Sequence, residues 1–543
     1  MTVLDVSIKH SGKSYPIALD TSKPAVAFKQ SIFEATGVPV ERMKVMVKGG
    51  MLKDDAEWAR VAPKAGQTFM VIGAAGDLPK APDQPVVFLE DLADSDLAKA
   101  ERIPVGFKNL GNTCYMNATL QTMRAIPELQ TALQAYRPAN TDNTNRLAVA
   151  LRDVYAGMER SAEGFVPFAF LQLLRQYVPQ FGETNRHGPG YAQQDAEECW
   201  TQVVQHLGVV PGPSGADSKF VQQYMMGQIR KELKCIEAPD EPATITVDEF
   251  KTVGCNITMQ TNFMQQGITD ALTETIEKHS PSLDRTAQYT QTARITRLPK
   301  NLVVHMVRFA WRRDINKKTK IMRRVKFPLE LDAAEWCSED LRAKMRVASD
   351  KSKEIERERR ERDKVRKRTK STLGSGEPGA DGDVQMAEAS TSAGDTAPLP
   401  ARDAADTSAA PAAAPAAGGD LRPEAEYRTK EREELEKLVH ADLKSDIGAS
   451  QTGLYELAGI VTHKGASAES GHYIGFVRRD AFTRADQATF EGKDEPEGEA
   501  FDEMWYKFDD DKVSVLGPEK IATLEGGGED SVAYILLYRS KAL

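Results

Sequence analysis

The chain has few cysteines, and it lacks a long apolar segment. Its five cysteines are scattered and odd in number, which predicts reduced thiols in the cytoplasm or nucleus rather than a disulfide framework. No apolar run approaches the roughly 18 residues that a membrane-spanning helix needs, and the start of the chain has no apolar signal region. The formal net charge of −9 argues against general nucleic-acid binding. We therefore expect a cytoplasmic or nuclear protein with no membrane partner and no nucleic-acid partner.

The first part of the chain has the pattern of a small independent domain. With 543 residues, 41% of them apolar, the chain is long enough for more than one domain. Within residues 1–76 the pattern predicts a hairpin that turns at Ser11–Gly12, a helix that ends at Gly37, and further strands. This order resembles ubiquitin, a β-grasp fold. Residues 77–102, rich in proline and acids, are expected to form a flexible linker.

The likeness to ubiquitin indicates where this domain would bind a partner. By that likeness Met46, Met70 and Ile72 fall near ubiquitin's hydrophobic recognition patch, and methionines make such a patch adaptable. Strand alternation does not decide whether these side chains face outward or belong to the domain's own core. Where ubiquitin ends in paired glycines, residues 73–76 read GAAG and the chain continues. The domain is therefore interpreted as a permanent docking module.

The segment 104–121, PVGFKNLGNTCYMNATLQ, places a cysteine where a helix is predicted to begin. Asn112 and Thr113 are favourable N-cap residues, and the apolar residues that follow recur at helical spacing. Cys114 would then lie in the first helical turn, where unpaired N–H groups and the helix dipole lower the pKa of a thiol from about 8.5. A cysteine in an apolar helix is otherwise an inert packing residue. From this segment alone, both interpretations of Cys114 stay open.

A histidine and several acids lie near the other end of the chain. Residues 470–478 are predicted to run from a loop into a strand, and residues 505–515 to form a second strand. If the two strands pair, His472 comes near one of the acids at 509–511. A thiolate nucleophile needs an imidazole to take and return its proton, and a carboxylate can fix the tautomer of that imidazole. Alternatively, His472 is a solvated strand end and the acids form a turn.

Four motifs in one order resemble the ubiquitin-specific protease family of cysteine-dependent deubiquitinases. They are GFKNLGNTCYMNATLQ, QQDAEECW, GHYIGFVR and WYKFDDDKVSV. Each alone is a weak signal, but four in order make a chance match improbable. The likeness covers residues 1–345 and 425–543, and it is greatest to the subgroup that carries an N-terminal ubiquitin-like domain and acts on the proteasome. It implies an α+β architecture, with a papain-like fingers-palm-thumb protease domain at 103–543 after the ubiquitin-like domain.

The resemblance also implies roles for individual residues. Cys114 would be the nucleophile, and His472 the general base and then the general acid. Asp509 would orient His472, with Asp510 as the nearest competitor for that role. Asn109 would donate to the developing oxyanion, where the loss of one donor costs on the order of 10²–10³ in rate. The sequence around Asn109 is equally typical of a turn.

A further set of residues would line a channel for ubiquitin's extended C-terminal tail. By the resemblance these residues are Gln194, Asp195, Glu198 and Tyr473. Carboxylates there would pair with a basic tail, and the tail's paired glycines would let it pass a narrow slot. A plainer interpretation is that the acids only compensate the dipole of a helix that starts at this motif.

Members of this family often hold a structural zinc ion with two CxxC pairs, which this chain lacks. The corresponding part has only the single cysteines Cys235 and Cys255, and two thiolates do not complete a tetrahedral zinc site. No metal and no cofactor is therefore predicted. Together with Cys199 and Cys337, these cysteines are interpreted as buried, small apolar residues.

Residues 346–424 are predicted to interrupt the protease domain. Their first part, 351–370, is strongly basic and is interpreted as a solvated helix in preference to a nuclear-localisation or nucleic-acid patch. The stretch that follows is of low complexity and cannot bury enough apolar surface to fold. Helical periodicity returns at 426–443. Loss of the low-complexity part should leave the fold intact.

Two polar segments near the predicted site are candidate lids. Residues 311–324 are basic, and residues 463–472 are small and contain glycine. In the subgroup resembled, loops at these positions cover the tail channel until ubiquitin or the proteasome moves them. Such residues are equally typical of exposed turns.

The chain is therefore interpreted as a deubiquitinase that hydrolyses the bond after ubiquitin's C-terminal glycine through an acyl-enzyme on Cys114. Its expected partners are ubiquitin, polyubiquitin conjugates and the regulatory particle of the 26S proteasome, which the ubiquitin-like domain would dock. The alternative is a non-catalytic ubiquitin-binding regulator of the proteasome. The intact set of Cys114, His472 and Asp509 favours the enzyme.

Overall fold

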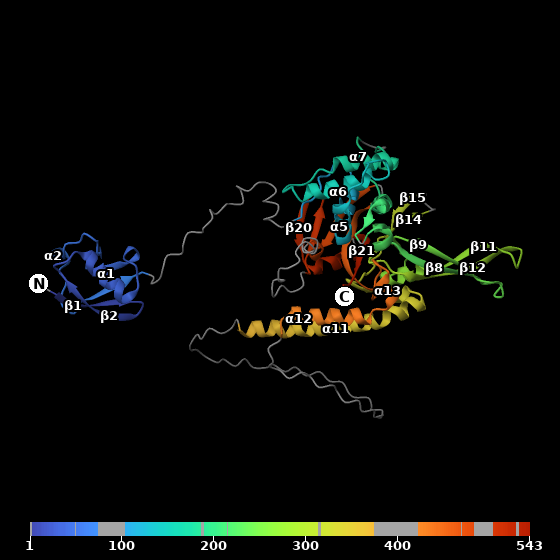
Figure 1. The fold of residues 1–543 in the computed structure, drawn as a ribbon. Helices are drawn as coiled ribbons and strands as arrows, with labels where there is room; N and C mark the ends of the chain where they lie inside the picture. Colours follow the sequence, from blue (N-terminus) through green and yellow to red (C-terminus); the bar gives the residue numbers. More distant parts are fainter. Residues whose placement is uncertain are drawn as a thin grey trace, which may run out of the picture. The chain divides into compact units, whose positions relative to one another are not determined.

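The computed structural model describes most of the chain, in two compact units that we treat separately, Met1–Asp91 and Leu92–Leu543 (Figure 1). The described residues are 3–48, 50–73, 104–185, 189–213, 215–312, 317–373, 422–467, 470–482, 503–527 and 531–542. The linker predicted at 77–102 lies outside them. None of the helices in the described ranges is long and apolar enough to cross a membrane.

The N-terminal unit is a five-stranded sheet with a helix across one face, the ubiquitin-like β-grasp fold that its pattern predicts. Its elements are β1 (Val3–His10), β2 (Lys13–Asp20), α1 (Ala25–Thr36), β3 (Lys44–Val47), β4 (Gly50–Met51), α2 (Trp58–Val61) and β5 (Thr68–Ile72). The strand order is β2-β1-β5-β3-β4, with β5 parallel to β1. Helix α1 buries Phe28 and Ile32 in the core and ends at Gly37, whose φ of 70° favours glycine.

The larger unit is built around an eight-stranded sheet in the order β10-β13-β21-β17-β18-β19-β20, with β16 paired to β17. These strands are β10 (Val253–Asn256), β13 (Asn301–Val307), β16 (Glu330–Asp332), β17 (Leu454–Ser467), β18 (Ser470–Arg478), β19 (Trp505–Asp509), β20 (Lys512–Leu516) and β21 (Val532–Ser540). Every residue of β21 is buried, because cores lie on both faces of the sheet.

Helices cover one face of this sheet and share a single apolar core with it. They are α4 (Cys114–Met123), α5 (Pro127–Ala135), α6 (Arg146–Met158), α7 (Phe168–Tyr177), α8 (Ala196–His206) and α9 (Phe220–Tyr224). The other face packs against α10 (Met264–Ala271) and the start of α11. Helix α4 lies between the sheet and α8, so all of its residues are buried and not only those of an apolar stripe.

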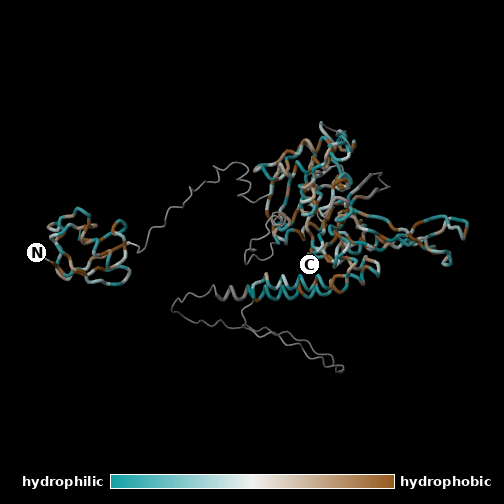
Figure 2. Tube along the Cα trace, in the orientation of Figure 1, coloured by the Kyte–Doolittle hydropathy of each residue, from teal (hydrophilic) through white to brown (hydrophobic). Residues whose placement is uncertain are grey.

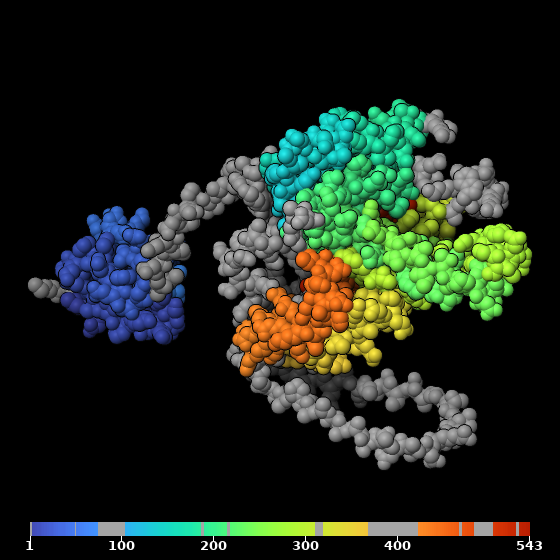
Figure 3. Space-filling model, turned by 45° about the vertical axis from the view of Figure 1, so that its right-hand side comes forward, coloured from blue at the N-terminus to red at the C-terminus, as the bar shows by residue number. Residues whose placement is uncertain are grey.

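Smaller sheets extend from this body. The longest forms the fingers, a four-stranded sheet in the order β11-β12-β8-β9 that projects on the right in Figure 3. Its strands are β8 (Gly227–Cys235), β9 (Thr244–Phe250), β11 (Thr273–Ser280) and β12 (Arg285–Arg297), and the two-stranded sheets are β6 (Pro211–Gly212) with β7 (Gly215–Lys219), and β14 (Phe309–Arg312) with β15 (Lys317–Lys320). Cys199, Cys235, Cys255 and Cys337 are buried and unpaired, as predicted.

The predicted insertion is helical over most of its described residues. Helix α11 (Glu339–Leu373) runs through its basic part, α12 (Glu424–Leu438) returns beside it, and α13 (Ala441–Ser445) follows a break at 439–440. Residues 374–421 lie outside the described ranges. Figure 2 shows α11 and α12 as mainly hydrophilic.

Three local predictions need correction. Residues 505–515 are not one strand, because β19 ends at Asp509 and Asp510 adopts a φ of 55°, which turns the chain into β20. Nor are the two candidate lids simple loops. Residues 463–472 contain the end of β17 and the start of β18, and residues 311–324 contain parts of the β14–β15 hairpin. Polar strand ends and tight turns have the same composition, so the sequence pattern did not separate them.

Candidate active site

Cys114 is brought to the sheet by close packing of α4 against glycines. A Cβ atom on Gly475 would lie 3.2 Å from the Ala118 carbonyl oxygen, and one on Gly459 would lie 2.7 Å from Thr122 Cγ2. A side chain at either glycine would therefore push the helix away. The N-terminus of α4 thus lies against β18, the strand that carries His472, and Cys114 is only 2% exposed.

The loop before Cys114 is fixed by its own polar groups. Thr113 occupies the N-cap position as predicted, but its side chain makes no capping hydrogen bond. Asn109 Oδ1 accepts the backbone N–H groups of Gly111 at 2.9 Å and Thr113 at 3.2 Å. Asn112, with a φ of 54°, donates from Nδ2 to the carbonyl of Tyr191 at 2.9 Å. These bonds determine where the helix begins and therefore where the sulfur lies.

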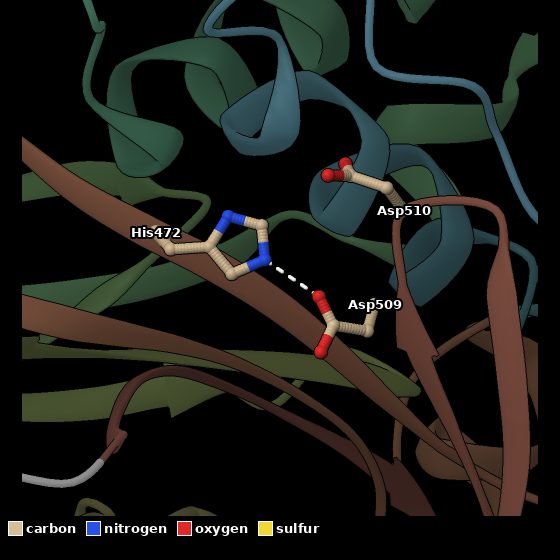
Figure 4. A group of neighbouring side chains, drawn as sticks. All are labelled: His472, Asp509 and Asp510. Atoms are coloured by element: carbon tan, nitrogen blue, oxygen red, sulfur yellow. Dashed lines mark hydrogen bonds and ion pairs between the residues drawn. The ribbon is translucent and has the colours of Figure 1, made fainter.

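His472 and Asp509 form the contact that the strand pairing predicts. His472 Nε2 lies 2.6 Å from Asp509 Oδ1 (Figure 4). The two residues come from the neighbouring antiparallel strands β18 and β19. Burial acts to raise the pKa of Asp509, but His472 and Lys507 hold it below its usual value. The resulting carboxylate accepts the Nε2 proton and orients the ring.

His472 also faces the cysteine. Its interaction with the Cys114 sulfur, opposed by burial and supported by Asp509, raises the pKa of His472 to about 9. The Cys114 sulfur and Asp509 thus favour the protonated form of the ring. An imidazolium beside a sulfur favours the thiolate form of the cysteine.

Asp510, the competing acid, is held by amides instead of by the histidine. Its Oδ1 accepts from Asn117 Nδ2 at 2.8 Å, and its Oδ2 accepts from Asn109 Nδ2 at 2.9 Å. The geometry therefore selects Asp509 as the partner of His472. It also shows the side-chain amide of Asn109 donating to a carboxylate, so an oxyanion role for Asn109 stays a prediction.

His472, Asp509 and Asp510 also form a group with the spacing of metal ligands. Among the described residues it is the one group of three or more such side chains, with ligand atoms within 4.8 Å of one another. Both oxygens of each carboxylate already have a donor, from His472 and Lys507 on Asp509 and from two asparagine amides on Asp510. The protein's own groups thus satisfy the cluster.

The acids predicted to line the tail channel lie at the start of α8. Asp195 caps this helix by accepting the Glu197 N–H at 2.9 Å. Both of its carboxylate oxygens also lie 2.8 Å from the hydroxyl of Tyr534, which donates to them. Glu198 is half-buried in the first turn. Asp195 therefore has a structural role in placing α8, and a role of these acids in the channel stays a prediction.

The other two predicted channel residues have different surroundings. Gln194 Nε2 donates to the Gln180 carbonyl at 2.8 Å. The Tyr473 side chain is 1% exposed, and its ring lies 4.7 Å from that of His463. Its ring packs in the core that β18 shares with the helices, and a role of Tyr473 in the tail channel stays a prediction.

Gln193 contacts Cys114, although the sequence analysis did not single it out. Its Nε2 donates to Cys114 Sγ at 3.1 Å, and the backbone N–H of Tyr473 donates to the same sulfur at 3.4 Å. The only signal in the sequence was its place in the QQDAEECW motif.

The described parts of the two candidate lids are joined. Lys320 of β15 forms hydrogen bonds to β17. Its Nζ donates to His463 Nδ1 at 3.0 Å, to the His463 carbonyl at 2.7 Å and to the Gly465 carbonyl at 3.0 Å. Burial lowers the pKa of Lys320 to about 8 and that of His463 to about 3. A covering role for these segments stays a prediction.

In the N-terminal unit, the predicted recognition residues face outward. Met46 is 40% exposed, and Met70 and Ile72 are each 53% exposed. Met51, paired with Met46 in the sheet, is 55% exposed and extends the patch. These four side chains lie on neighbouring strands, opposite the face that packs against α1. They form an apolar surface patch and are not part of the core.

Comparison with known proteins accounts for nearly the whole chain. The family model described as ubiquitin carboxyl-terminal hydrolase matches residues 105–538. Ubiquitin carboxyl-terminal hydrolase 6 of Schizosaccharomyces pombe is 37% identical over 99% of both chains. Ubiquitin carboxyl-terminal hydrolase 7 of Arabidopsis thaliana is 34% identical over 100% of both chains, and hydrolase 14 of Caenorhabditis elegans is 28% identical over 99% of this chain and 94% of its own. Since these matches include the N-terminal unit as well as the protease region, the chain belongs to the ubiquitin-specific protease family and is a cysteine-dependent deubiquitinase.

Proposed function

We propose that Cys114 is the nucleophile of this deubiquitinase, that His472 is its general base and acid, and that the enzyme trims ubiquitin from conjugates held at the 26S proteasome. The observation that supports the catalytic roles is the position of His472, which faces the Cys114 sulfur on one side and lies 2.6 Å from Asp509 on the other. This is the relation that nucleophile, base and orienting acid need.

The reaction follows from that geometry. The Cys114 thiolate attacks the carbonyl carbon of ubiquitin's terminal glycine, and the carbonyl π electrons move to oxygen. The C–N bond then breaks as His472 gives its proton to the leaving lysine amine. In the second half, neutral His472 takes a proton from water, which attacks the thioester and releases ubiquitin and the thiolate. Asp509 keeps the ring in place through both halves, and the backbone N–H of Cys114 with the amide of Asn109 are the proposed oxyanion donors.

The proposed place of action rests on the N-terminal unit. Its exposed patch of Met46, Met51, Met70 and Ile72 is apolar, and such patches mark protein-binding sites. We assign it to docking on the regulatory particle of the proteasome. Docking by one domain raises the effective concentration of the other near its substrate. Five unpaired cysteines are consistent with a cytoplasmic or nuclear location for such an enzyme.

A ubiquitin that carries a C-terminal electrophile tests the catalytic assignment. Wild-type protein should be labelled, and more strongly when the proteasome is present. Cys114→Ala should abolish both labelling and hydrolysis while ubiquitin affinity stays within about a few-fold, because the substitution removes only the attacking atom. Undiminished cleavage by this variant would refute the assignment.

A charge placed in the patch tests the docking assignment. Met70→Glu, like deletion of residues 1–73, should sharply weaken proteasome binding and leave basal hydrolysis of a ubiquitin-fused reporter nearly unchanged. Phe33→Glu is the matched control, because Phe33 is 43% exposed but lies on α1, across the unit from the patch. Unchanged proteasome affinity of Met70→Glu would remove the patch from docking. A large rise in the basal rate on truncation would make the unit an intramolecular inhibitor instead.

A further inference from the structure

The sulfur of Cys114 accepts hydrogen bonds. The side-chain amide of Gln193 donates to it at 3.1 Å, and the backbone N–H of Tyr473 donates at 3.4 Å. Hydrogen bonds from N–H groups favour the charged form of an acceptor, and they are stronger when the acceptor carries a charge. This environment therefore suits a thiolate better than a thiol.

Two other cysteines of the described chain have the opposite arrangement. Cys255 Sγ donates to the carbonyl of Met264 at 3.5 Å, and Cys337 Sγ donates to the carbonyl of Ala333 at 3.3 Å. Burial raises the pKa of both thiols to about 12. Sulfur atoms that face carbonyl oxygens are neutral donors. The direction of the hydrogen bonds thus separates Cys114 from these packing cysteines.

The segment that carries Gln193 is anchored on both sides. Before it, the carbonyl of Tyr191 accepts from Asn112 Nδ2 at 2.9 Å, which ties the segment to the loop that leads into Cys114. After it, Gln194 Nε2 donates to the carbonyl of Gln180 at 2.8 Å. With its neighbours held, Gln193 presents its amide to the sulfur without a large loss of side-chain freedom.

We propose that Gln193 is a catalytic residue that stabilises the Cys114 thiolate in the free enzyme by donating a hydrogen bond to its sulfur. The amide of Asn109 donates to Asp510, whereas the amide of Gln193 donates to the sulfur. This role deepens the proposed function, because it rests on Cys114 being the nucleophile. When the thioester forms, the sulfur loses its charge and the bond to Gln193 weakens.

Alkylation of Cys114 in the full-length protein tests this role without ubiquitin. The rate of reaction with iodoacetamide, followed by mass spectrometry of the Cys114 peptide from about pH 4 to 10, reports the fraction of thiolate. Gln193→Met keeps the side-chain length and removes the donor, so the midpoint of the profile should rise by about one pH unit. Gln193→Glu, which places a negative acceptor at the sulfur, should raise it further.

Gln205→Met is the matched control, because it makes the same exchange at an exposed position of α8, away from the anchors of Gln193. It should leave the midpoint unchanged. A second readout separates the proposed role from binding of the ubiquitin tail. Loss of the thiolate donor lowers kcat/KM by up to about tenfold below the wild-type midpoint, and the activity recovers above the new midpoint. Loss of a tail contact raises KM at every pH.

Two results would overturn the inference. One is an alkylation midpoint equal to that of the wild type in Gln193→Met protein whose melting temperature shows that it is folded. The other is a rise in KM with no change in the midpoint. If Gln193→Met fails to fold, Gln193→Ala decides by the same midpoint. A failure of the proposed function would look different. Cys114→Ala would then still hydrolyse the reporter, whatever the alkylation profiles of the Gln193 variants.

Discussion

Helices α4 and α11 are held in place by opposite means. All ten residues of α4 are buried between the sheet and α8. The outer part of α11 is instead joined to α12 by ion pairs, with Glu431 2.7 Å from Arg359 and 2.6 Å from Arg362. A buried helix cannot shift without opening the core, whereas a charged pair of helices can move or be lost with less effect on the rest. Cys114, the proposed nucleophile, therefore lies on the more constrained of the two helices, whereas the insertion continues from the helix that tolerates change.

Activity should show the largest difference between these regions. His472→Ala removes the group that exchanges protons with Cys114, so kcat/KM for a ubiquitin-fused reporter should fall by at least about 10³. Arg362→Ala, in α11, should change it by less than about twofold. Steady-state kinetics on the two purified variants checks this, and a comparable loss in both would erase the distinction.

The same assay sharpens the choice of acid. Asp509→Asn should retain more activity than His472→Ala, because an amide can still orient the imidazole. A far greater loss in Asp510→Ala than in Asp509→Ala would mean that the orienting acid is Asp510.

The next largest difference should be in stability. Leu120 of α4 is 0% exposed, and Leu120→Ala should lower the free energy of unfolding by about 2–5 kcal/mol because the cavity cannot collapse fully. Val347 of α11 is 56% exposed, and Val347→Ala should change it by less than about 0.5 kcal/mol. Urea unfolding of both variants measures the two values. Equal losses would mean that α11 is as deeply integrated as α4.

The sequence predicted the helices and strands of the two regions better than the contacts between them. The helix at Cys114, the β-grasp unit and the helical parts of the insertion follow from periodicity and turn residues, and the pairing of His472 with Asp509 follows from motif order and strand pairing. The turn at Asp510 did not follow, because an acid in a tight turn has the composition of an exposed strand position.

The sequence pattern also did not predict contacts between segments that lie far apart in the chain. Gln193 and Cys114 are 79 positions apart, and their hydrogen bond depends on how the segment before α8 is anchored over α4. Gly459 and Gly475 allow α4 to pack closely against the sheet. In the sequence they look like ordinary glycines within strands, because the position of the helix is not known. The burial of Tyr473 likewise depends on the helices that pack against its face of β18.

A smaller loss is expected from breaking the ion pairs of α11. Glu431 is 7% exposed and pairs with two arginines, so Glu431→Ala leaves partly buried cations and should cost about 1–3 kcal/mol. Glu433→Ala, at an exposed position of the same helix, is the control and should cost less than about 0.5 kcal/mol. Activity should stay unchanged in both. A fall in kcat/KM with Glu431→Ala would couple the helical pair to the active site.

The pH dependence of stability should distinguish the two regions more finely. The folded state raises the pKa of His472 from 6.5 to about 9, so between these values the folded protein holds a proton that the unfolded chain has lost. The stabilisation is complete below about pH 6.5 and is lost as pH rises through about 9. The α11–α12 ion pairs that Glu431 makes are with arginines and include no histidine.

Melting temperatures of wild type and His472→Ala between about pH 6.5 and 9 measure this pH-dependent contribution of His472 to stability. The fall with rising pH should be shallower in the variant, and shallow even in wild type because the ring is partly exposed to solvent. Parallel curves would mean that the histidine is not held in its charged form by the folded site.

Removal of residues 374–421 should have the smallest effect of all. The last third of α11 already contacts the start of α12, since Arg366 Nη2 lies 2.7 Å from the Arg422 carbonyl and 3.1 Å from Glu424. A short Gly-Ser linker between them closes a smaller loop, which should leave the free energy of unfolding unchanged or raise it by at most about 1.5 kcal/mol. The removed stretch has too few large apolar residues to supply a core. Calorimetry and reporter kinetics on the deletion, with a same-length scrambled stretch as the control, check both expectations. A clear drop in melting temperature or in kcat/KM for the deletion alone would show that the length of this stretch matters. A drop for both the deletion and the scrambled chain would show that the sequence of residues 374–421 contributes to the folded unit, and the insertion would then not be dispensable.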